Sequence, residues 1–375
     1  MLGFALTDDQ RALLEEARRA GQKLTEVARG GPAGRVNRPL VRGLADEGIL
    51  GRLFPAGGEV SSMSLCLLRE GLAMVSTEAE TALALQGLGG YPILQAARPE
   101  VAERWIPRVT AGEAVAAFAL TEPAHGSDAA ALELLADRAD GGWRLDGEKA
   151  FISNAPDADV YTVFARTTPG AGSRGVTAFC VPGDSPGLSG EPVELLAPHA
   201  IGHLRFDGVV VPDDHVLGDT DAGFRVAMAT LDLFRPSVGA FAVGMAAAAL
   251  EEALAHAGER TSMGKPLREH QAVSQRLGEM ATRTEAARLL VYAAASAHDR
   301  GERVTRISAM AKLFATETAQ LVVDGAVQVL GARALERGHP LEHLYREVRA
   351  PRIYEGTSEI QREIIARELY RDRPG

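Results

Sequence analysis

A carboxylate in an unusual position is the first feature of this sequence that could do chemistry. Glu355 lies in the stretch RIYEGTSEIQ at 352–361, directly before a glycine. Ser358 and Gln361 have the Ser-x-x-Gln spacing of a capping box, which predicts that a helix begins there. Glu355 therefore falls in a tight turn beside apolar residues. Burial in such surroundings raises the pKa of a carboxyl group, which suits a general base. The alternative is a structural carboxylate favoured by the helix dipole.

Other patterns that could carry chemistry are incomplete. GLGG at 87–90 lacks the full G-x-G-x-x-G and does not follow a predicted strand, which argues against a dinucleotide loop. The pairs His199/His203 and His339/His343 are each spaced by four, but no third ligand is indicated. They are interpreted as loop or surface histidines, and no metal site is expected. No serine nucleophile elbow between a predicted strand and a helix is identified, so a serine hydrolase is not expected.

Length and composition are those of an ordinary globular protein. The chain has 375 residues, of which 46% are apolar and 24% charged, and its net charge is −10. The length predicts two or three structural units. The acidic balance argues against nucleic acid or a membrane surface as a partner.

Cysteine usage and the apolar runs indicate a cytoplasmic protein. Cys66 and Cys180 are the only cysteines and lie far apart, which is typical of a reducing compartment. The N-terminal stretch MLGFALTDDQ has no secretory pattern. The most apolar run, at 239–250, is too short and alanine-rich to span a bilayer and predicts a buried helix.

Residue patterning divides the chain into three parts, 1–114, 115–216 and 217–375. The first is helical in character and opens at Thr7, a predicted N-cap. The second has short runs rich in Val, Phe, Tyr and Thr between Gly, Pro and Asp, which predict an antiparallel sheet or small barrel. The third returns to helical patterns, at 238–260, 270–300, 303–331, 341–349 and 359–370. The predicted fold class is a multidomain α+β protein.

Several segments, in this order along the chain, resemble the acyl-CoA dehydrogenase family of FAD flavoproteins. The resemblance covers nearly the whole chain and implies an N-terminal helical domain, a middle antiparallel β-domain and a C-terminal helical bundle. It also implies a homodimer or tetramer, with the flavin between the middle and C-terminal domains. The segments include ALTEPAHGSD at 119–128, DGEKAFISNA at 146–155, FDGVVVPDDHVLG at 206–218 and RIYEGTSEIQREIIAR at 352–367.

The resemblance implies dehydrogenation of an acyl thioester. In this chemistry a base removes a proton from the α-carbon, and a hydride passes from the β-carbon to the flavin. The family base is the glutamate before Gly-Thr, which here is Glu355. The implied partners are an acyl thioester on CoA or acyl carrier protein and an electron acceptor such as an electron-transfer flavoprotein.

The resemblance also implies which residues contact the cofactor. The loop expected against the flavin ring contributes Phe118, Leu120, Thr121 and Ser127. Phe151, Ile152 and Ser153 match a segment often written Trp-Ile-Thr, so the Phe151 ring would pack on the flavin and the Ser153 hydroxyl would lie near N5. The alternative for Phe151 is a strand core residue.

Further contacts come from the C-terminal part. Arg260 would reach the cofactor's pyrophosphate across the dimer interface, since a guanidinium suits a diphosphate. Gln328 would contact the adenosine portion from the neighbouring subunit, and Thr357 would approach the cofactor at a helix start. The residues that match positions near the thioester are Ser127, Asp232 and Arg235, although Arg235 could equally be a buried structural arginine.

Departures from the family pattern bear on the substrate. His125 replaces a small residue, GARA at 331–334 replaces a glycine-rich segment, and ARPEVAER at 97–104 also differs. With the low-lysine, arginine-rich composition, these point to family members of polyketide extender-unit pathways, such as that for methoxymalonyl-acyl carrier protein. A small oxygenated acyl group on a carrier protein is therefore expected. An ordinary short-chain acyl-CoA dehydrogenase, a flavin oxidase or monooxygenase, and a non-catalytic acyl- or carrier-binding protein remain alternatives.

Overall fold

The computed structural model describes residues 6–55, 59–197 and 199–371. The chain forms two compact units, each built from separate segments. Unit 1 contains Met1–Lys23, Ser61–Glu80 and Asp232–Gly375, and unit 2 contains Leu24–Val60 and Thr81–Leu231. The first five residues of the N-terminal stretch considered for a secretory signal lie outside the described residues.

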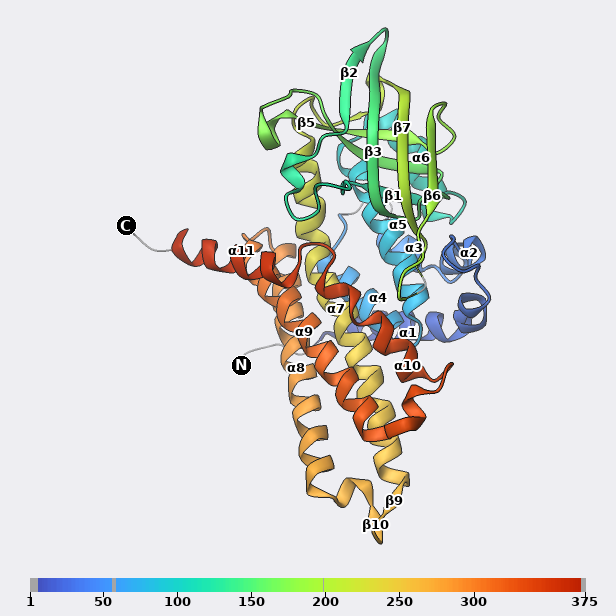
Figure 1. The fold of residues 1–375 in the computed structure, drawn as a ribbon, viewed down its shortest axis with the longest axis vertical. Helices are drawn as coiled ribbons and strands as arrows, with labels where there is room; N and C mark the ends of the chain where they lie inside the picture. The colour runs from blue at the N-terminus through green and yellow to red at the C-terminus, as the bar shows by residue number, and fades with distance from the viewer. Residues whose placement is uncertain (1–5, 56–58, 198, 372–375) are drawn as a thin grey trace. The chain divides into compact units, whose positions relative to one another are not determined.

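Unit 2 contains an eight-stranded sheet (Figure 1). Its strand order is β6-β7-β3-β2-β4-β5-β8, and β1 pairs with β4. The helices α2 Arg38–Asp46, α3 Ile49–Leu53, α6 Pro99–Thr110 and most of α5 Thr77–Ala96 belong to the same unit. The strands are β1 Ala116–Ala119, β2 Leu135–Ala139, β3 Gly142–Ser153, β4 Val160–Arg166, β5 Val176–Pro182, β6 Leu188–Pro192, β7 Ile201–Pro212 and β8 Val216–Leu217.

The sheet is mainly antiparallel, as the strand patterns predict, but it has two parallel pairings. Strand β1 runs parallel to β4, and β2 meets β4 in parallel where Leu135 pairs with Arg166. All seven residues of β4 are buried. Burial on both faces is the pattern of a strand with parallel neighbours, and the run VYTVFAR accordingly lacks polar alternation.

The GLGG segment belongs to helix α5 and not to a dinucleotide loop. A Cβ atom at Gly89 would lie 2.4 Å from the backbone nitrogen of Ala117 on β1. The glycine therefore lets the helix approach the first strand closely, which is a packing role.

Unit 1 is helical. It contains most of α1 Asp8–Arg29, α4 Ser62–Ala73, α7 Gly223–Glu259 from Asp232 onward, α8 Gln271–Asp299, α9 Thr305–Leu330, α10 Pro340–Glu347 and α11 Ser358–Arg371, with a short hairpin of β9 Thr261–Ser262 and β10 Lys265–Pro266. Thr7 caps α1 as predicted: its Oγ1 accepts a hydrogen bond from Gln10 N (3.2 Å), and its N–H donates to Gln10 Oε1 (3.0 Å). Both cysteines are buried and free.

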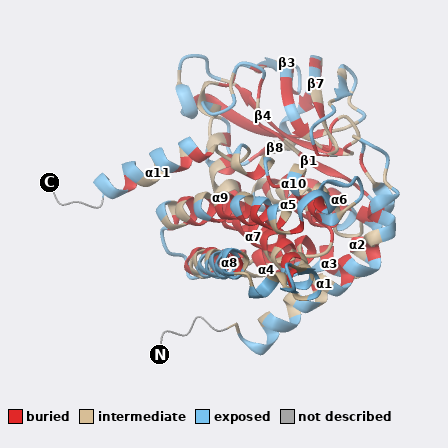
Figure 2. Ribbon diagram, turned by 60° about the horizontal axis from the view of Figure 1, so that its bottom comes forward, coloured by how far each residue is buried: buried red, intermediate tan, exposed pale blue. Residues whose placement is uncertain are grey.

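The core of unit 1 is rich in alanine. Buried alanines on α7, α8 and α9 form one cluster with Phe241, Val291 and Val322, and Figure 2 shows α7 largely buried. A Cβ at Gly239 on α7 would meet Val291 on α8 at 2.6 Å and Ala315 on α9 at 3.4 Å. Small residues thus allow three long helices to pack at close range.

Helix α7 extends further than its sequence pattern indicates. It begins at Gly223, fifteen residues before the predicted start at 238, and continues through Pro236. Its 37 residues are long and apolar enough to cross a membrane by length and composition alone, so the interpretation of its apolar run as too short was wrong. The apolar window is mostly buried within the structure, as in the core helix of a globular protein.

Candidate active site

Glu355 lies in a left-handed turn immediately before α11. Its φ is 51°, and that of Gly356 is 90°. The Gln361 side-chain amide donates to the carbonyl oxygens of Glu355 and Gly356 (3.1 Å each), and Lys312 Nζ donates to the Gly356 carbonyl (2.7 Å). A left-handed backbone costs free energy for a non-glycine residue, and these hydrogen bonds offset that cost. The turn therefore fixes where the Glu355 carboxylate lies.

The helix begins as predicted, but its cap is one residue earlier than expected. Thr357 Oγ1 accepts from Ile360 N (3.3 Å), and the Thr357 carbonyl accepts from Gln361 N (2.9 Å). The Ser358 hydroxyl instead donates to Glu317 Oε1 on α9 (2.6 Å). The predicted capping box at Ser358 was therefore wrong, because Gln361 is needed to hold the Glu355 turn.

The carboxylate of Glu355 is influenced by the charges of three cations and not only by apolar groups. Its Oε2 is buried and has no hydrogen-bond partner, while neighbouring Ile353 is 53% exposed. Burial raises the pKa of Glu355, and the charges of Arg69, Arg235 and Lys312 oppose this rise without cancelling it. A carboxylate with a raised pKa and no fixed partner can accept a proton from a ligand.

Two of these cations were missed from the sequence. Arg69 is 3% exposed on α4, and its guanidinium pairs with the fully buried Glu80 and donates to Ser237 Oγ (2.7 Å). Lys312 is fully buried on α9. Burial lowers the pKa of Lys312 to about 8, although the Glu355 charge opposes this shift. For Arg69 and for Lys312 alike, the sequence offered one signal of a special role, which was a lone cation within an apolar helical stretch.

Arg235 and Asp232 form an ion pair on α7. Arg235 Nη1 lies 3.0 Å from Asp232 Oδ1, and Arg235 is 7% exposed. The Nε of Arg235 is buried and has no hydrogen-bond partner. The structure thus brings Arg235 close enough to Glu355 for its charge to act on the carboxylate, and it leaves one donor unused.

Phe151 is held outward by an irregularity in β3. The register with β7 shifts between Lys149 and Ile152, Phe151 has a φ of 54°, and its side chain is 54% exposed. Bulges of this kind redirect a side chain next to a functional site. The alternative of a strand core residue is therefore wrong for Phe151. Ile152 is buried, and Ser153, the last residue of the strand, is half-buried.

The loop after β1 is tied to this bulge by hydrogen bonds. The buried Lys149 Nζ donates to the Leu120 carbonyl (3.0 Å) and to Glu122 Oε1 (2.8 Å), and Ala150 N donates to the Thr121 carbonyl (2.9 Å). Burial lowers the pKa of Lys149 to about 8, and the Glu122 charge opposes that shift. The two segments expected to contact a flavin ring are therefore held together within unit 2.

The other predicted residues of the loop lie in different environments. Phe118 is half-buried and its ring contacts Phe164 with a centroid distance of 4.8 Å, Leu120 is 8% exposed, and Ser127 is exposed. His125 lies in the same loop, with Nε2 3.5 Å from Glu133 Oε1. Ser127 is thus accessible to a ligand, whereas Leu120 can offer only backbone groups.

Arg260 and Gln328 are exposed at the ends of two helices of unit 1. Arg260 follows α7, and Gln328 lies in the last turn of α9. Burial lowers the pKa of His256, and the charges of Arg333 and Arg260 add to the effect. Arg333 in the GARA segment therefore contributes positive charge near Arg260. Among the described residues Arg260 forms no ion pair, so its guanidinium is available for a diphosphate.

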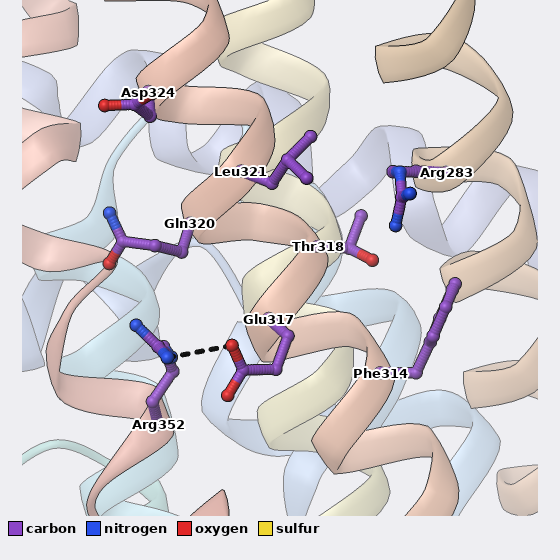
Figure 3. A pocket seen from close by; sticks show the side chains of 8 residues that line it. All are labelled: Arg283, Phe314, Glu317, Thr318, Gln320, Leu321, Asp324 and Arg352. Atoms are coloured by element: carbon purple, nitrogen blue, oxygen red, sulfur yellow. Dashed lines mark ion pairs between the residues drawn. The ribbon is translucent and has the colours of Figure 1, made fainter.

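A cavity of about 420 Å³ lies between α8, α9 and the chain before Glu355. Figure 3 shows Arg352 directed toward Glu317, with a distance of 2.9 Å between Nη2 and Oε2. The lining includes none of the predicted site residues. No group of three metal-ligating side chains occurs among the described residues, and His343 contacts Thr77 (2.6 Å).

These residues fit FAD and a thioester by their chemistry. Phe151 presents an aromatic face, Arg260 an unpaired cation, and Glu355 a carboxylate without a hydrogen-bond partner at Oε2. Within unit 1 the structure brings Glu355, Arg235 and Lys312 together, and within unit 2 it brings the Leu120 loop and the Phe151 bulge together.

Comparisons with known proteins agree with this chemistry. Models of the acyl-CoA dehydrogenase N-terminal, middle and C-terminal domains match residues 7–113, 117–209 and 221–370. Cyclohexane-1-carbonyl-CoA dehydrogenase of Geobacter metallireducens is 34% identical, and the match covers 98% of this chain and 99% of that protein.

Two solved structures are also similar along the whole chain. Butyryl-CoA dehydrogenase of Megasphaera elsdenii has a TM-score of 0.92 at 33% identity, covering 98% of this chain and 100% of that one. A chain from a study of the electron transferring flavoprotein of Acidaminococcus fermentans has a TM-score of 0.94 at 33% identity, covering 99% and 100%. This chain therefore belongs to the acyl-CoA dehydrogenase family, whose members are FAD-dependent enzymes that oxidise acyl thioesters.

Proposed function

We propose that Glu355 is the base that removes the α-proton of the acyl thioester. The observation that supports this role is the buried Oε2 without a hydrogen-bond partner, in a turn fixed by Gln361 and Lys312. The α C–H electron pair forms the new double bond as the proton passes to Glu355. FAD, when bound, accepts the hydride that leaves the β-carbon.

The cations around Glu355 give the base its character. Arg69, Arg235 and Lys312 keep the carboxylate charged enough to accept a proton, while burial keeps its pKa above that of an exposed glutamate. The flavin ring would be held by Phe118, Leu120, Thr121, Phe151, Ile152 and Ser153. Thr357, directly before α11, would also approach the ring. Arg260 and Gln328 would bind the diphosphate and adenosine parts, and Ser127, Asp232 and Arg235 the thioester.

We further propose a small oxygenated acyl group carried on an acyl carrier protein, as in polyketide extender-unit pathways. The polar groups around Glu355 and the departures at His125 and at 331–334 support this choice. The likeness to a chain solved with work on an electron transferring flavoprotein supports such a protein as the electron acceptor.

A thioester panel tests this proposal. Purified FAD-loaded protein would be mixed anaerobically with oxygenated and simple acyl groups, each on CoA and on acyl carrier protein, and the loss of flavin absorbance followed. We expect the oxygenated acyl carrier protein thioester to reduce the flavin fastest. Fastest reduction by CoA esters of ordinary short fatty acids would contradict the carrier-protein role, and a colourless protein that FAD does not restore would contradict an enzymatic role.

A further inference from the structure

The buried pair of Arg69 and Glu80 is a polar feature in the apolar helix α4. Ten of the twelve residues of this helix are buried, and its remaining buried side chains are mostly aliphatic. The Arg69 guanidinium pairs with Glu80 through Nε and donates to Ser237 through Nη1. A buried ion pair is weak evidence for stability, because the desolvation of two charges opposes their attraction. Its presence therefore calls for a functional explanation.

The pair contacts helix α7 near Arg235, and the charge of Arg69 acts on the proposed base. Ser237, which Arg69 contacts, is two residues from Arg235 on α7, and Tyr354 directly precedes Glu355. The Arg69 charge acts on both Tyr354 and Glu355. All of these residues belong to unit 1, so their arrangement is set within one compact body.

Several polar atoms of this cluster have no partner. Glu355 Oε2 and Arg235 Nε are buried without a hydrogen bond. Nη2 of Arg69 has no acceptor among the described residues, and it is not one of the fully buried atoms. Buried polar groups in proteins are almost always paired, so the unused Glu355 Oε2 and Arg235 Nε indicate a polar ligand, to which the more accessible Arg69 Nη2 can also donate.

The charges of the cluster limit what that ligand can carry. Arg69, Arg235 and Lys312 are matched by Glu80, Asp232 and Glu355, so no positive charge remains unbalanced. A further carboxylate would be repelled by Glu80 and Glu355. A neutral oxygen can accept a hydrogen bond from Arg69 Nη2 without that repulsion.

We propose that Arg69, held by Glu80 and Ser237, is a specificity-determining residue that selects an acyl group bearing a neutral oxygen, such as an ether, hydroxyl or carbonyl. This inference rests on the proposed role of Glu355. The Arg69 guanidinium would supply the hydrogen bond that favours an oxygenated acyl group. Acyl groups that end in a carboxylate would be excluded.

The test compares three CoA thioesters of similar length. In 4-methoxybutyryl-CoA an ether oxygen replaces one methylene of hexanoyl-CoA, and glutaryl-CoA carries a distal carboxylate. The ratio of kcat/KM between the ether and hexanoyl esters would be measured by anaerobic flavin bleaching. We expect the wild-type protein to favour the ether by roughly 10- to 100-fold, the worth of a hydrogen bond to a charged donor, and to use glutaryl-CoA poorly.

Paired substitutions separate selectivity from stability. Arg69→Met with Glu80→Leu removes both charges, so neither is left buried alone, and should reverse the preference toward hexanoyl-CoA. Arg288→Met with Glu70→Leu is the matched control, because the buried Glu70 is the next residue of α4 and pairs with the partly buried Arg288 (2.7 Å). We expect the control to alter the melting temperature but leave the ratio within about twofold, since each pair should act independently.

Each remaining outcome would overturn the inference in a distinguishable way. A wild-type preference for hexanoyl-CoA, rapid use of glutaryl-CoA, or an unchanged ratio in the Arg69/Glu80 variant would remove Arg69 from selection while leaving Glu355 as the base. If none of the three acyl groups bleached the flavin of FAD-loaded protein, either as the CoA thioester or as the acyl carrier protein thioester, the proposed function would fail, and the inference with it.

Discussion

At the residue scale, the role of Glu355 gives the sharpest expectation. Glu355→Gln keeps the shape of the side chain but cannot accept a proton at neutral pH. Because Oε2 has no hydrogen-bond partner in the structure, the substitution breaks no ion pair, and the protein should remain folded and yellow. Flavin reduction in rapid-mixing experiments should slow by roughly 10²- to 10⁴-fold.

The exposed Glu359 provides the control for this variant. Its side chain is 74% exposed on α11, the helix that follows Glu355, so Glu359→Gln should leave the rate near that of the wild type. A rate for Glu355→Gln close to the wild-type value would exclude Glu355 as the base. A colourless, unfolded variant would instead favour the structural interpretation of this carboxylate.

The pKa of Glu355 predicts the pH dependence of flavin reduction. Burial raises this pKa above its ordinary value of 4.5. Glu355 can act as a base only when it is deprotonated. The rate of flavin reduction should therefore be maximal above the raised pKa of Glu355 and fall as the pH drops through it. The loss should therefore begin at a higher pH than for an exposed glutamate.

Lys312 shifts that profile in a direction that can be tested. Its charge lowers the pKa of Glu355, so Lys312→Met should move the inflection to still higher pH. The measurement is the pH profile of the reduction rate, with Glu355→Gln as the variant that should lack the inflection. An inflection that stays in place would mean that Lys312 supports the turn through Gly356 but does not tune the base.

The sequence revealed Glu355 but not its surroundings, for a physical reason. A Glu-Gly-Thr turn before a helix is a local pattern, so spacing alone could locate it. The charges of Arg69 and Lys312 act on Glu355 from other helices of unit 1, and each appears in sequence as a single cation in an apolar stretch. Likewise, the outward position of Phe151 depends on a bulge that the sequence AFIS does not reveal.

At the element scale, two helix glycines should respond oppositely to alanine. A Cβ at Gly244 on α7 would lie 2.6 Å from both Ala73 Cβ and the Glu70 carbonyl oxygen of α4, whereas nothing lies within 4 Å of a Cβ at Gly278 on α8. Gly244→Ala should therefore lower the free energy of unfolding by about 1–3 kcal/mol through overpacking. Gly278→Ala should raise it by about 0.5–1 kcal/mol, the difference in helix propensity.

Denaturant unfolding of the two variants checks this pair of expectations. Equal destabilisation would show that Gly278 also contacts something, whereas a neutral Gly244→Ala would show that α4 and α7 can separate at little cost. Wild-type flavin content in Gly278→Ala serves as the control for an intact fold.

The observed helix boundaries agree with the sequence prediction where short-range sequence signals determine them. Thr7, the predicted N-cap, placed the start of α1, and the apolar periodicities placed α8 to α11 within a few residues. The start of α7 was missed because the polar Asp232 and Arg235, together with Pro236, interrupt its pattern before residue 238. The parallel pairing of β1 with β4 could not be read either, because it joins segments more than forty residues apart.

At the scale of the whole molecule, the chain is expected to work as a dimer with shared cofactor sites. Arg260 is exposed and unpaired among the described residues, and Arg333 adds positive charge nearby, as a diphosphate site on a subunit surface requires. We expect FAD to dissociate as the protein is diluted into monomers, which fluorescence of released flavin would measure. A monomer that retains FAD tightly would contradict a shared site.

Mixed dimers test the shared site directly. An Arg260→Ala subunit lacks the diphosphate contact that it would supply to its partner, and a Glu355→Gln subunit lacks its own base, so each homodimer should be nearly inactive. In a mixed dimer, one site combines the intact Glu355 of the first subunit with the intact Arg260 of the second. Random exchange at equal concentrations should therefore restore about a quarter of the wild-type sites, as two-fold symmetry dictates. Activity that stays at the level of the two separate variants would place Arg260 and Glu355 in the site of the same subunit, or in different functions.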